Sequence, residues 1–199
     1  MPIKRVWAPR IDFSVIRREL KLPTDFPPDA LREANEAATT TPMPATDLTD
    51  VPFVTIDPAT SKDLDQAMHL SHRDGGGYRV RYAIADVAAF VRPGGPLDTE
   101  TWSRGQTIYL PDGRIPLHPT VLSEGAVSLF PDVDRAAVVW TIDLDADGAM
   151  ADVRLERARV RSRAKLDYAG VQAAVDAGNA PEPVALLPEL GALLARRAA

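Results

Sequence analysis

The sequence contains no cysteine, few aromatic residues and no long hydrophobic run. Without cysteine, the chain forms no disulfide and binds no zinc through thiolates. Aromatic residues make up 6% of the 199 residues, and no apolar signal core follows the first five residues. A transmembrane helix needs about 20 consecutive apolar residues, and no such stretch is present. We therefore expect a cytoplasmic protein that has no contact with a membrane.

An excess of positive charge is also lacking. The chain has 23 basic and 28 acidic residues, which gives a formal net charge of -5. This balance excludes a generic basic coat for nucleic acid, so any binding of RNA must depend on local arrangement. The three histidines, His69, His72 and His118, are too scattered for a zinc site and are expected at the surface or behind a site.

Three aspartates, Asp57, Asp63 and Asp65, lie within nine residues of one another. An apolar segment at 51–56 predicts a buried strand that ends at Asp57. If the chain is extended at 63–65, Asp63 and Asp65 point to one side and Leu64 points into the core. Carboxylates this close repel one another unless a cation lies among them, and hard oxygen ligands suit Mg²⁺ or Mn²⁺. The cluster predicts a metal site, and the alternative is a solvated acidic turn.

The remaining pattern predicts an α+β fold with mixed, largely antiparallel strands and helices. Residues 1–50 are expected to form an N-terminal helical arm and linker, with helices at 12–20 and 28–38 and a linker at 39–50. Hairpins are expected from 67–70 with 78–84 and from 138–144 with 153–160, and helices at 97–104, 168–177 and 184–197.

The run from Asp143 to Gly148 begins like an EF-hand calcium loop. Its twelfth position holds Arg154 in place of the required glutamate, and the flanks read as strands. We interpret the run as a hairpin turn.

Several motifs occur together in a recognisable order. They are Phe53 to Ala67, Tyr82 to Val87, Tyr109-Leu110-Pro111, Ile115-Pro116-Leu117, Leu122-Ser123 and Ser128-Leu129. Over about residues 51 to 180 the chain resembles the catalytic domain of the ribonuclease II / ribonuclease R family, called the RNB domain. By this resemblance, residues 51–199 are the N-terminal half of an RNB-like catalytic domain that is incomplete at its C-terminus.

The resemblance implies a processive, Mg²⁺-dependent exoribonuclease, with Mn²⁺ as a possible substitute. Such an enzyme hydrolyses single-stranded RNA from the 3′ end to nucleoside 5′-monophosphates. The family's four metal-site aspartates match Asp57, Asp63, Asp65 and Gln66. By analogy Asp57 binds metal, Asp63 binds or positions it, and Asp65 is the most sensitive catalytic carboxylate. Gln66 keeps an oxygen but loses a negative charge, so we expect weaker cation binding.

Further residues are implied to bind RNA. The resemblance places Tyr109 and Tyr168 where aromatic rings stack on terminal nucleotides, and the alternative is a pair of core tyrosines. Five basic residues alternate with small or apolar ones, so an extended strand carries them on one face: Arg157, Arg159, Arg161, Arg163 and Lys165. That row either neutralises phosphates or is an ordinary solvated strand face.

Three functions remain open at this point. The first is the exoribonuclease, with single-stranded RNA as partner, no obligate protein partner, and activity expected of the full-length protein rather than of this fragment. The second is a catalytically impaired RNB-like RNA-binding or scaffold protein, which Gln66 and the missing C-terminal half motivate. The third is a metal-dependent phosphoesterase on small substrates, which the carboxylates alone permit.

Overall fold

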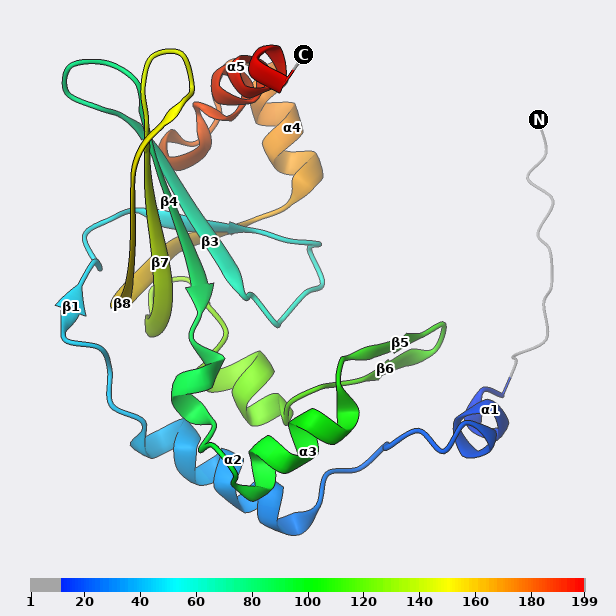
Figure 1. The fold of residues 1–199 in the computed structure, drawn as a ribbon. Coiled ribbons are helices and arrows are strands. Elements are labelled where there is room, and N and C mark those ends of the chain that lie inside the picture. The colour runs from blue at the N-terminus through cyan, green and yellow to red at the C-terminus, as the bar shows by residue number, and fades with distance from the viewer. Residues whose placement is uncertain (1–11, 199) are drawn as a thin grey trace, which may run out of the picture.

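A computed structural model describes residues 12–198. Its centre is a sheet whose six strands run in the order β1-β8-β2-β3-β4-β7 within these residues (Figure 1). Because β8 also pairs with β7, the strands from β8 to β7 close on themselves. The bounds are β1 (Thr46–Asp47), β2 (Phe53–Ile56), β3 (Gln66–His72), β4 (Tyr78–Ala85), β7 (Asp134–Leu144) and β8 (Met150–Leu166).

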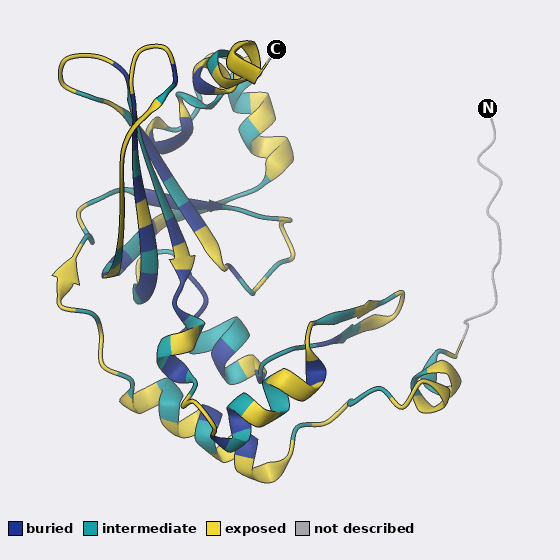
Figure 2. Cartoon of the chain, in the orientation of Figure 1, coloured by how far each residue is buried: buried dark blue, intermediate teal, exposed yellow. Residues whose placement is uncertain are grey.

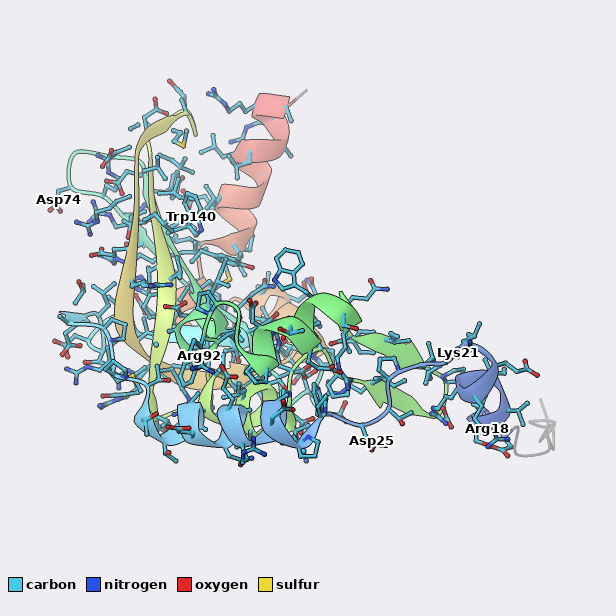
Figure 3. The ribbon with its side chains drawn as sticks, turned by 60° about the horizontal axis from the view of Figure 1, so that its bottom comes forward. Arg18, Lys21, Asp25, Asp74, Arg92 and Trp140 are labelled. Atoms are coloured by element: carbon cyan, nitrogen blue, oxygen red, sulfur yellow. The ribbon has the colours of Figure 1, made fainter. Side chains whose placement is uncertain are left out.

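The helices gather at two ends of this sheet (Figure 1). At one end lie α2 (Pro28–Thr40), α3 (Pro96–Arg104), the 3₁₀ turn η1 (Val87–Phe90) and the π turn η2 (Leu122–Ala126). At the other end lie α4 (Tyr168–Asp176), the 3₁₀ turn η3 (Glu182–Val184) and α5 (Leu187–Ala198). Helix α1 (Ser14–Glu19) lies away from the body, and Figure 3 labels Arg18 and Lys21 there. Every helix within residues 12–198 is too short or too polar to span a bilayer.

A separate hairpin, β5 (Ile108–Leu110) with β6 (Gly113–Ile115), projects from the end of the sheet that carries α2 and α3. The sequence pattern did not predict it, because strands of three residues are too short to show an alternation. Its tip contacts α1 through an ion pair of 2.6 Å between Arg17 Nη2 and Asp112 Oδ1. The hairpin is thus held at its outer end as well as at its base.

Strand β8 is the longest strand of the sheet and pairs with β1, β2 and β7. Its first part pairs antiparallel with β7, and its last residues pair in parallel with β2, from Phe53 opposite Ser162 to Ile56 opposite Leu166. The parallel pairing brings the end of β2 beside the start of α4. Residues separated by more than one hundred positions therefore meet at the point where Asp57 leaves the sheet.

Glycine fixes the turns of the two predicted hairpins. Gly77 has φ 88°, and a Cβ atom there would lie 2.2 Å from the carbonyl oxygen of Leu144. In the β7–β8 turn, Gly148 has φ 76°, and Oδ1 of Asp145 accepts from the amide of Ala149 at 2.8 Å. Both hairpins are confirmed, and the run from Asp143 to Gly148 forms the end of β7 and the turn of the second one.

The main core lies between the closed sheet and the helices α2 and α3 (Figure 2). Phe53, Leu64, Leu97 and Leu122 are completely buried there. A smaller cluster joins Leu190 of α5 to the opposite end of the sheet. The mixed, largely antiparallel sheet with flanking helices confirms the α+β prediction.

The N-terminal segment differs in part from the expectation. Both predicted helices are present, but α2 is packed into the domain, with Ala30 and Ala34 fully buried. The predicted linker at 39–50 begins inside α2, and its strand β1 pairs with β8 through Thr46 opposite Ala158. A boundary at residue 50 stays a prediction. His69 was expected at the surface or behind a site, and because it is 6% exposed the surface alternative is wrong for it.

Candidate active site

The acidic loop, residues 57–65, begins where β2 ends. The amide of Asp57 donates to the carbonyl of Leu166 at 3.0 Å, which extends the parallel pairing by one step. The loop then turns, with the amide of Ser61 donating to the carbonyl of Pro58 at 2.9 Å, and reaches β3 at Gln66. The loop therefore starts and finishes on neighbouring strands of the sheet.

Leu64 anchors the loop to the core. Its side chain is completely buried, and its amide donates to Oγ of Ser128 at 3.0 Å. The amide of Leu129 donates back to the carbonyl of Leu64 at 2.8 Å, and Ser128 Oγ donates to the carbonyl of Lys62 at 2.7 Å. Leu64 thus points inward as predicted, and the carboxylates on either side of it reach the surface.

The loop is also held by a lysine from β8. Nζ of Lys165 donates to the carbonyls of Ala59 at 2.7 Å and of Ser61 at 2.6 Å. This ammonium group brings positive charge to the base of the acidic loop. Lys165 therefore supports the loop and is not presented freely to a phosphate.

Asp57 and Asp65 lie close enough to affect each other. Burial raises the pKa of Asp57, and the negative charge of Asp65 raises it further, with a smaller contribution from Asp63. Lys165 opposes these effects. A carboxyl whose pKa is raised in this way carries a negative charge that the protein does not fully compensate. Such a charge favours the approach of a cation.

Two tyrosines lie beside this pair. The Tyr82 hydroxyl donates a hydrogen bond to Oε1 of Gln66. Burial raises the pKa of Tyr82, and so do the nearby groups Asp65, Asp57 and Tyr168, in that order. Asp57, Asp65, Gln66, Tyr82 and Tyr168 therefore share one locality at the edge of the sheet.

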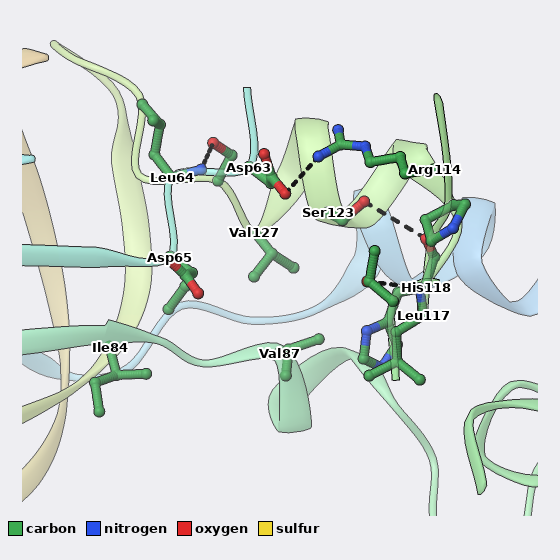
Figure 4. Close-up of a pocket in the computed structure, with 14 residues that line it drawn as sticks. Asp63, Leu64, Asp65, Ile84, Val87, Arg114, Leu117, His118, Ser123 and Val127 are labelled. Atoms are coloured by element: carbon green, nitrogen blue, oxygen red, sulfur yellow. Dashed lines mark hydrogen bonds and ion pairs between the residues drawn. The ribbon is translucent and has the colours of Figure 1, made fainter. Parts of the chain in front are cut away.

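Asp63 is directed elsewhere. Its Oδ2 pairs with Nη1 of Arg114 on β6 at 2.7 Å, and Nη2 of the same guanidinium pairs with Glu124 of η2. Figure 4 shows the Asp63–Arg114 contact beside a cavity of about 260 Å³, which Asp65, Ile84 and His118 also line. Burial lowers the pKa of His118.

The predicted three-carboxylate cluster is only partly assembled. Within residues 12–198, no three acidic or histidine side chains are gathered so that they hold one metal ion. Asp57 and Asp65 are near each other, but Asp63 is committed to Arg114. As placed, these residues do not form a complete metal site, and the metal site stays a prediction.

The tyrosines predicted to stack on RNA are both on the surface. Tyr109 on β5 is 72% exposed and lies opposite Arg114 of the same hairpin, and Tyr168 at the start of α4 is 63% exposed. Asp167 caps α4 by accepting from the amide of Gly170 at 2.9 Å, which fixes the direction of that helix. The alternative of core tyrosines is wrong, and stacking on RNA stays a prediction.

The basic row occupies one face of β8, as predicted, because Ala158, Val160 and Ser162 between its members are buried. Its members already have partners within the protein. Three pair with carboxylates and two donate to carbonyls: Arg157 with Asp86 at 2.9 Å, Arg159 with Asp47, Arg161 with Asp134 at 2.7 Å, Arg163 with the carbonyl of Thr49, and Lys165 with the loop. Binding of phosphates by this row stays a prediction.

Sequence reasoning missed Arg114, Glu124 and Tyr82. Arg114 lies between two of the recognised motifs, Tyr109–Pro111 and Ile115–Leu117, and that position was the available signal. Nothing in the sequence pairs Arg114 with an aspartate 51 residues away. Tyr82 was noted only as the first residue of the motif Tyr82 to Val87, and no role in the site was assigned to it.

Comparison with known proteins accounts for most of the chain. The family model described as RNB domain matches residues 45–196. Ribonuclease R of Acidithiobacillus ferrooxidans is 37% identical over 193 residues, which is 94% of this chain and 44% of that protein. Ribonuclease R of Escherichia coli strain K12 is 42% identical over 125 residues, which is 63% of this chain and 15% of that protein.

Solved structures agree with these relatives. Mycoplasma genitalium RNase R in complex with double-stranded RNA superposes with a TM-score of 0.82 at 27% identity and covers 93% of this chain and 35% of that one. Yeast Ssd1, a pseudonuclease, has a TM-score of 0.68 at 15% identity and covers 78% of this chain and 20% of that one, which shows likeness of fold alone. The chain spans less than half the length of these relatives. On the extent of the family match, the chain belongs to the RNB domain family.

Proposed function

We propose that this chain supplies part of the catalytic domain of a 3′-to-5′ exoribonuclease that hydrolyses single-stranded RNA to nucleoside 5′-monophosphates. The observation that carries the proposal is Asp57, whose pKa is raised by burial and by its neighbour Asp65. Both carboxylates and the exposed Tyr168 lie close enough to Tyr82 to act on its hydroxyl. This arrangement offers acidic groups for phosphodiester chemistry next to a surface on which a base stacks.

The relatives favour RNA as the substrate. Two relatives in sequence are named ribonuclease R, and Mycoplasma genitalium RNase R has been solved with double-stranded RNA and with ribose-methylated single-stranded RNA. The acidic net charge of -5 and the internally paired basic row argue against binding through a broad positive surface. We therefore assign recognition of RNA mainly to stacking on Tyr109 and Tyr168.

Dependence on Mg²⁺ or Mn²⁺ and a cytoplasmic location are further parts of this proposal. Support for the cation comes from the raised pKa of Asp57 and from the exposure of Asp65. Both carboxylates lie at the end of β2 and the start of β3, and a rigid sheet edge keeps such groups in a fixed relation. Asp63 joins them only after a rearrangement of its contact with Arg114.

The direct test uses Asp65→Asn in the full-length protein. The parent and the variant are incubated with 3′-end-labelled and 5′-end-labelled single-stranded RNA, with Mg²⁺, Mn²⁺ or a chelator. We expect stepwise loss from the 3′ end with the parent and a loss of hydrolysis of at least about 100-fold with the variant, while RNA binding persists. Asp74→Asn in the exposed β3–β4 turn is the matched control (Figure 3).

Two results would contradict the proposal. If Asp65→Asn degrades RNA at the parental rate, Asp65 is not a catalytic carboxylate. Cleavage of a chromogenic phosphate ester in place of RNA moves the protein to the phosphoesterase class. A DNA strand of the same sequence serves as a further comparison, because preference for RNA requires recognition of the ribose 2′-hydroxyl.

A second candidate is an RNA-binding protein of this family with impaired catalysis. It is favoured by Gln66, whose oxygen accepts from Tyr82, and by the engagement of Asp63 with Arg114. In that case the parent binds single-stranded RNA but releases no nucleotides at any cation concentration. Gln66→Asp then restores no hydrolysis in the full-length protein.

A further inference from the structure

Arg114 joins three segments that are far apart in the sequence. Its guanidinium contacts Asp63 of the acidic loop at 2.7 Å and Glu124 of η2, and Arg114 itself belongs to β6. All three side chains are half-buried, with exposed fractions of 34% for Asp63, 23% for Glu124 and 30% for Arg114. The contacts to both carboxylates raise the pKa of Arg114, so its charge is permanent in the folded protein.

This contact places a permanent positive charge on one of the three aspartates of the acidic loop. The Oδ2 atom of Asp63 is occupied by Nη1 of Arg114, and the pair lies at the wall of the cavity that Asp65 also lines (Figure 4). An arginine and a divalent cation cannot both take the same carboxylate oxygen at full strength, because each contact requires the approach of a positive charge. Asp57 and Asp65 carry no such arginine contact among the described residues.

We infer that Arg114 competes with a divalent cation for Asp63, so that the cation gains its third carboxylate only when Arg114 releases it. This inference rests on the proposed function, because it concerns the cation of that same site. Arg114 is a positioning residue in this account, since it acts through Asp63. When Arg114 leaves Asp63, Glu124 remains as its partner and compensates its charge.

The position of Arg114 also links the cation to the surface predicted to bind RNA. Tyr109 lies directly opposite Arg114 in the β5–β6 hairpin. A base stacked on Tyr109 would therefore lie on the same short hairpin that carries the arginine.

The test measures cation binding without catalysis. Mn²⁺ is titrated into the purified full-length protein, and the free ion is followed by its electron paramagnetic resonance signal. Arg114→Gln keeps a hydrogen-bonding side chain and removes the charge. We expect it to lower the Mn²⁺ concentration for half-saturation on the order of tenfold, since one nearby and partly solvated positive charge is lost. Arg114→Lys keeps the charge and is expected to stay near the parental value.

Two further variants show where the gain arises. In the double variant Asp63→Asn, Arg114→Gln we expect the tighter Mn²⁺ binding to disappear, because the Asp63 carboxylate that Arg114→Gln sets free is then absent. Arg159→Gln is the matched control, since Arg159 also contacts two carboxylates, Asp47 and Asp134, but not Asp63. Thermal denaturation in chelator checks that each variant is folded.

The outcomes separate this inference from the proposed function. If Asp65→Asn weakens Mn²⁺ binding and Arg114→Gln leaves it unchanged or weaker, the competition is wrong and the proposed cation site stands. If neither the parent nor Arg114→Gln binds Mn²⁺, both the cation dependence and the competition are wrong. Tighter binding by Arg114→Gln that the double variant abolishes supports the inference.

Discussion

The hydroxyl of Tyr82 donates a hydrogen bond to Oε1 of Gln66, across neighbouring strands of the sheet. Gln66 stands where the resemblance to the family expects a fourth aspartate. A neutral amide oxygen satisfies the hydroxyl without adding negative charge beside Asp65 and Asp57, which already raise the pKa of Tyr82. The glutamine therefore limits the repulsion at this edge of the sheet and also limits its attraction for cations.

Gln66→Asp is expected to change the stability in opposite directions with and without a divalent cation. In chelator, the added carboxylate repels Asp65 and lowers the free energy of unfolding by about 1 kcal/mol. With saturating Mn²⁺, the midpoint of thermal unfolding rises above that of the parent, because the folded state then binds the cation more tightly.

The comparison for this prediction is Gln106→Asp, which makes the same change at another exposed position. It is expected to leave the free energy of unfolding within about 0.5 kcal/mol of the parent under both conditions. If Gln66→Asp behaves like Gln106→Asp in Mn²⁺, position 66 does not contribute to cation binding.

Asp57 gives a pH dependence whose sign follows from its raised pKa. Burial, and then Asp65, raise that pKa above the ordinary value of 3.8, so ionisation is harder in the folded state than in the unfolded state. The contribution of Asp57 to the free energy of unfolding is fully present below pH 3.8, and it is lost as the pH rises through the pKa of Asp57 in the folded state. We expect Asp57→Asn in chelator to unfold at a temperature higher than the parent by up to about 4 °C at pH 7, with the difference narrowing towards pH 4.

Asp47 is the control of opposite sign. Hydrogen bonds from Thr49, and then from Arg159, lower the pKa of Asp47 to about 2. The contribution of the ionised Asp47 to stability is present above pH 3.8 and is lost as the pH falls towards 2. Asp47→Asn is therefore expected to lower the midpoint at pH 7. Equal shifts of one sign for both variants would contradict the assignment of Asp57.

The periodic elements could be predicted from the sequence, because their signals are local. The hairpin between β3 and β4 shows alternating side chains around a glycine turn, and α2 begins at Pro28 as expected. Leu64 could be placed in the core because it alternates with Asp63 and Asp65. These features depend on residues that are adjacent in the chain.

The electrostatic pairing of the site could not be predicted. Asp63 looked equivalent to Asp57 and Asp65, and only the fold brings Arg114 to it from another hairpin. The basic row on β8 showed its alternation but not its partners, since Asp134 and Asp47 come from other strands. Long-range charge pairing leaves no period in a sequence, so a pattern of like charges overstates how exposed they are.

Ser128 is expected to control the stability of the acidic loop. Ser128→Ala leaves the buried amide of Leu64 and the carbonyl of Lys62 without their partner, which costs about 1 to 3 kcal/mol in the free energy of unfolding. Urea denaturation monitored by circular dichroism measures this change. Ser123→Ala is the control, because the hydroxyl of Ser123 makes only a contact of 3.5 Å to the carbonyl of His118. A cost below that of the control would mean that Ser128 does not hold the loop.

The last prediction concerns the two exposed tyrosines. Tyr109→Ala and Tyr168→Ala are each expected to weaken binding of single-stranded RNA by about 1 to 3 kcal/mol, because a stacking surface is lost, whereas the phenylalanine variants keep most of the affinity. Fluorescence anisotropy with a short labelled oligoribonucleotide in chelator measures binding without cleavage. Trp102→Ala removes another large exposed ring, 82% exposed on α3, and is expected to leave the affinity unchanged. If the tryptophan variant loses as much affinity as the tyrosine variants, binding is spread over the exposed rings, and the path of the RNA does not run specifically over Tyr109 and Tyr168.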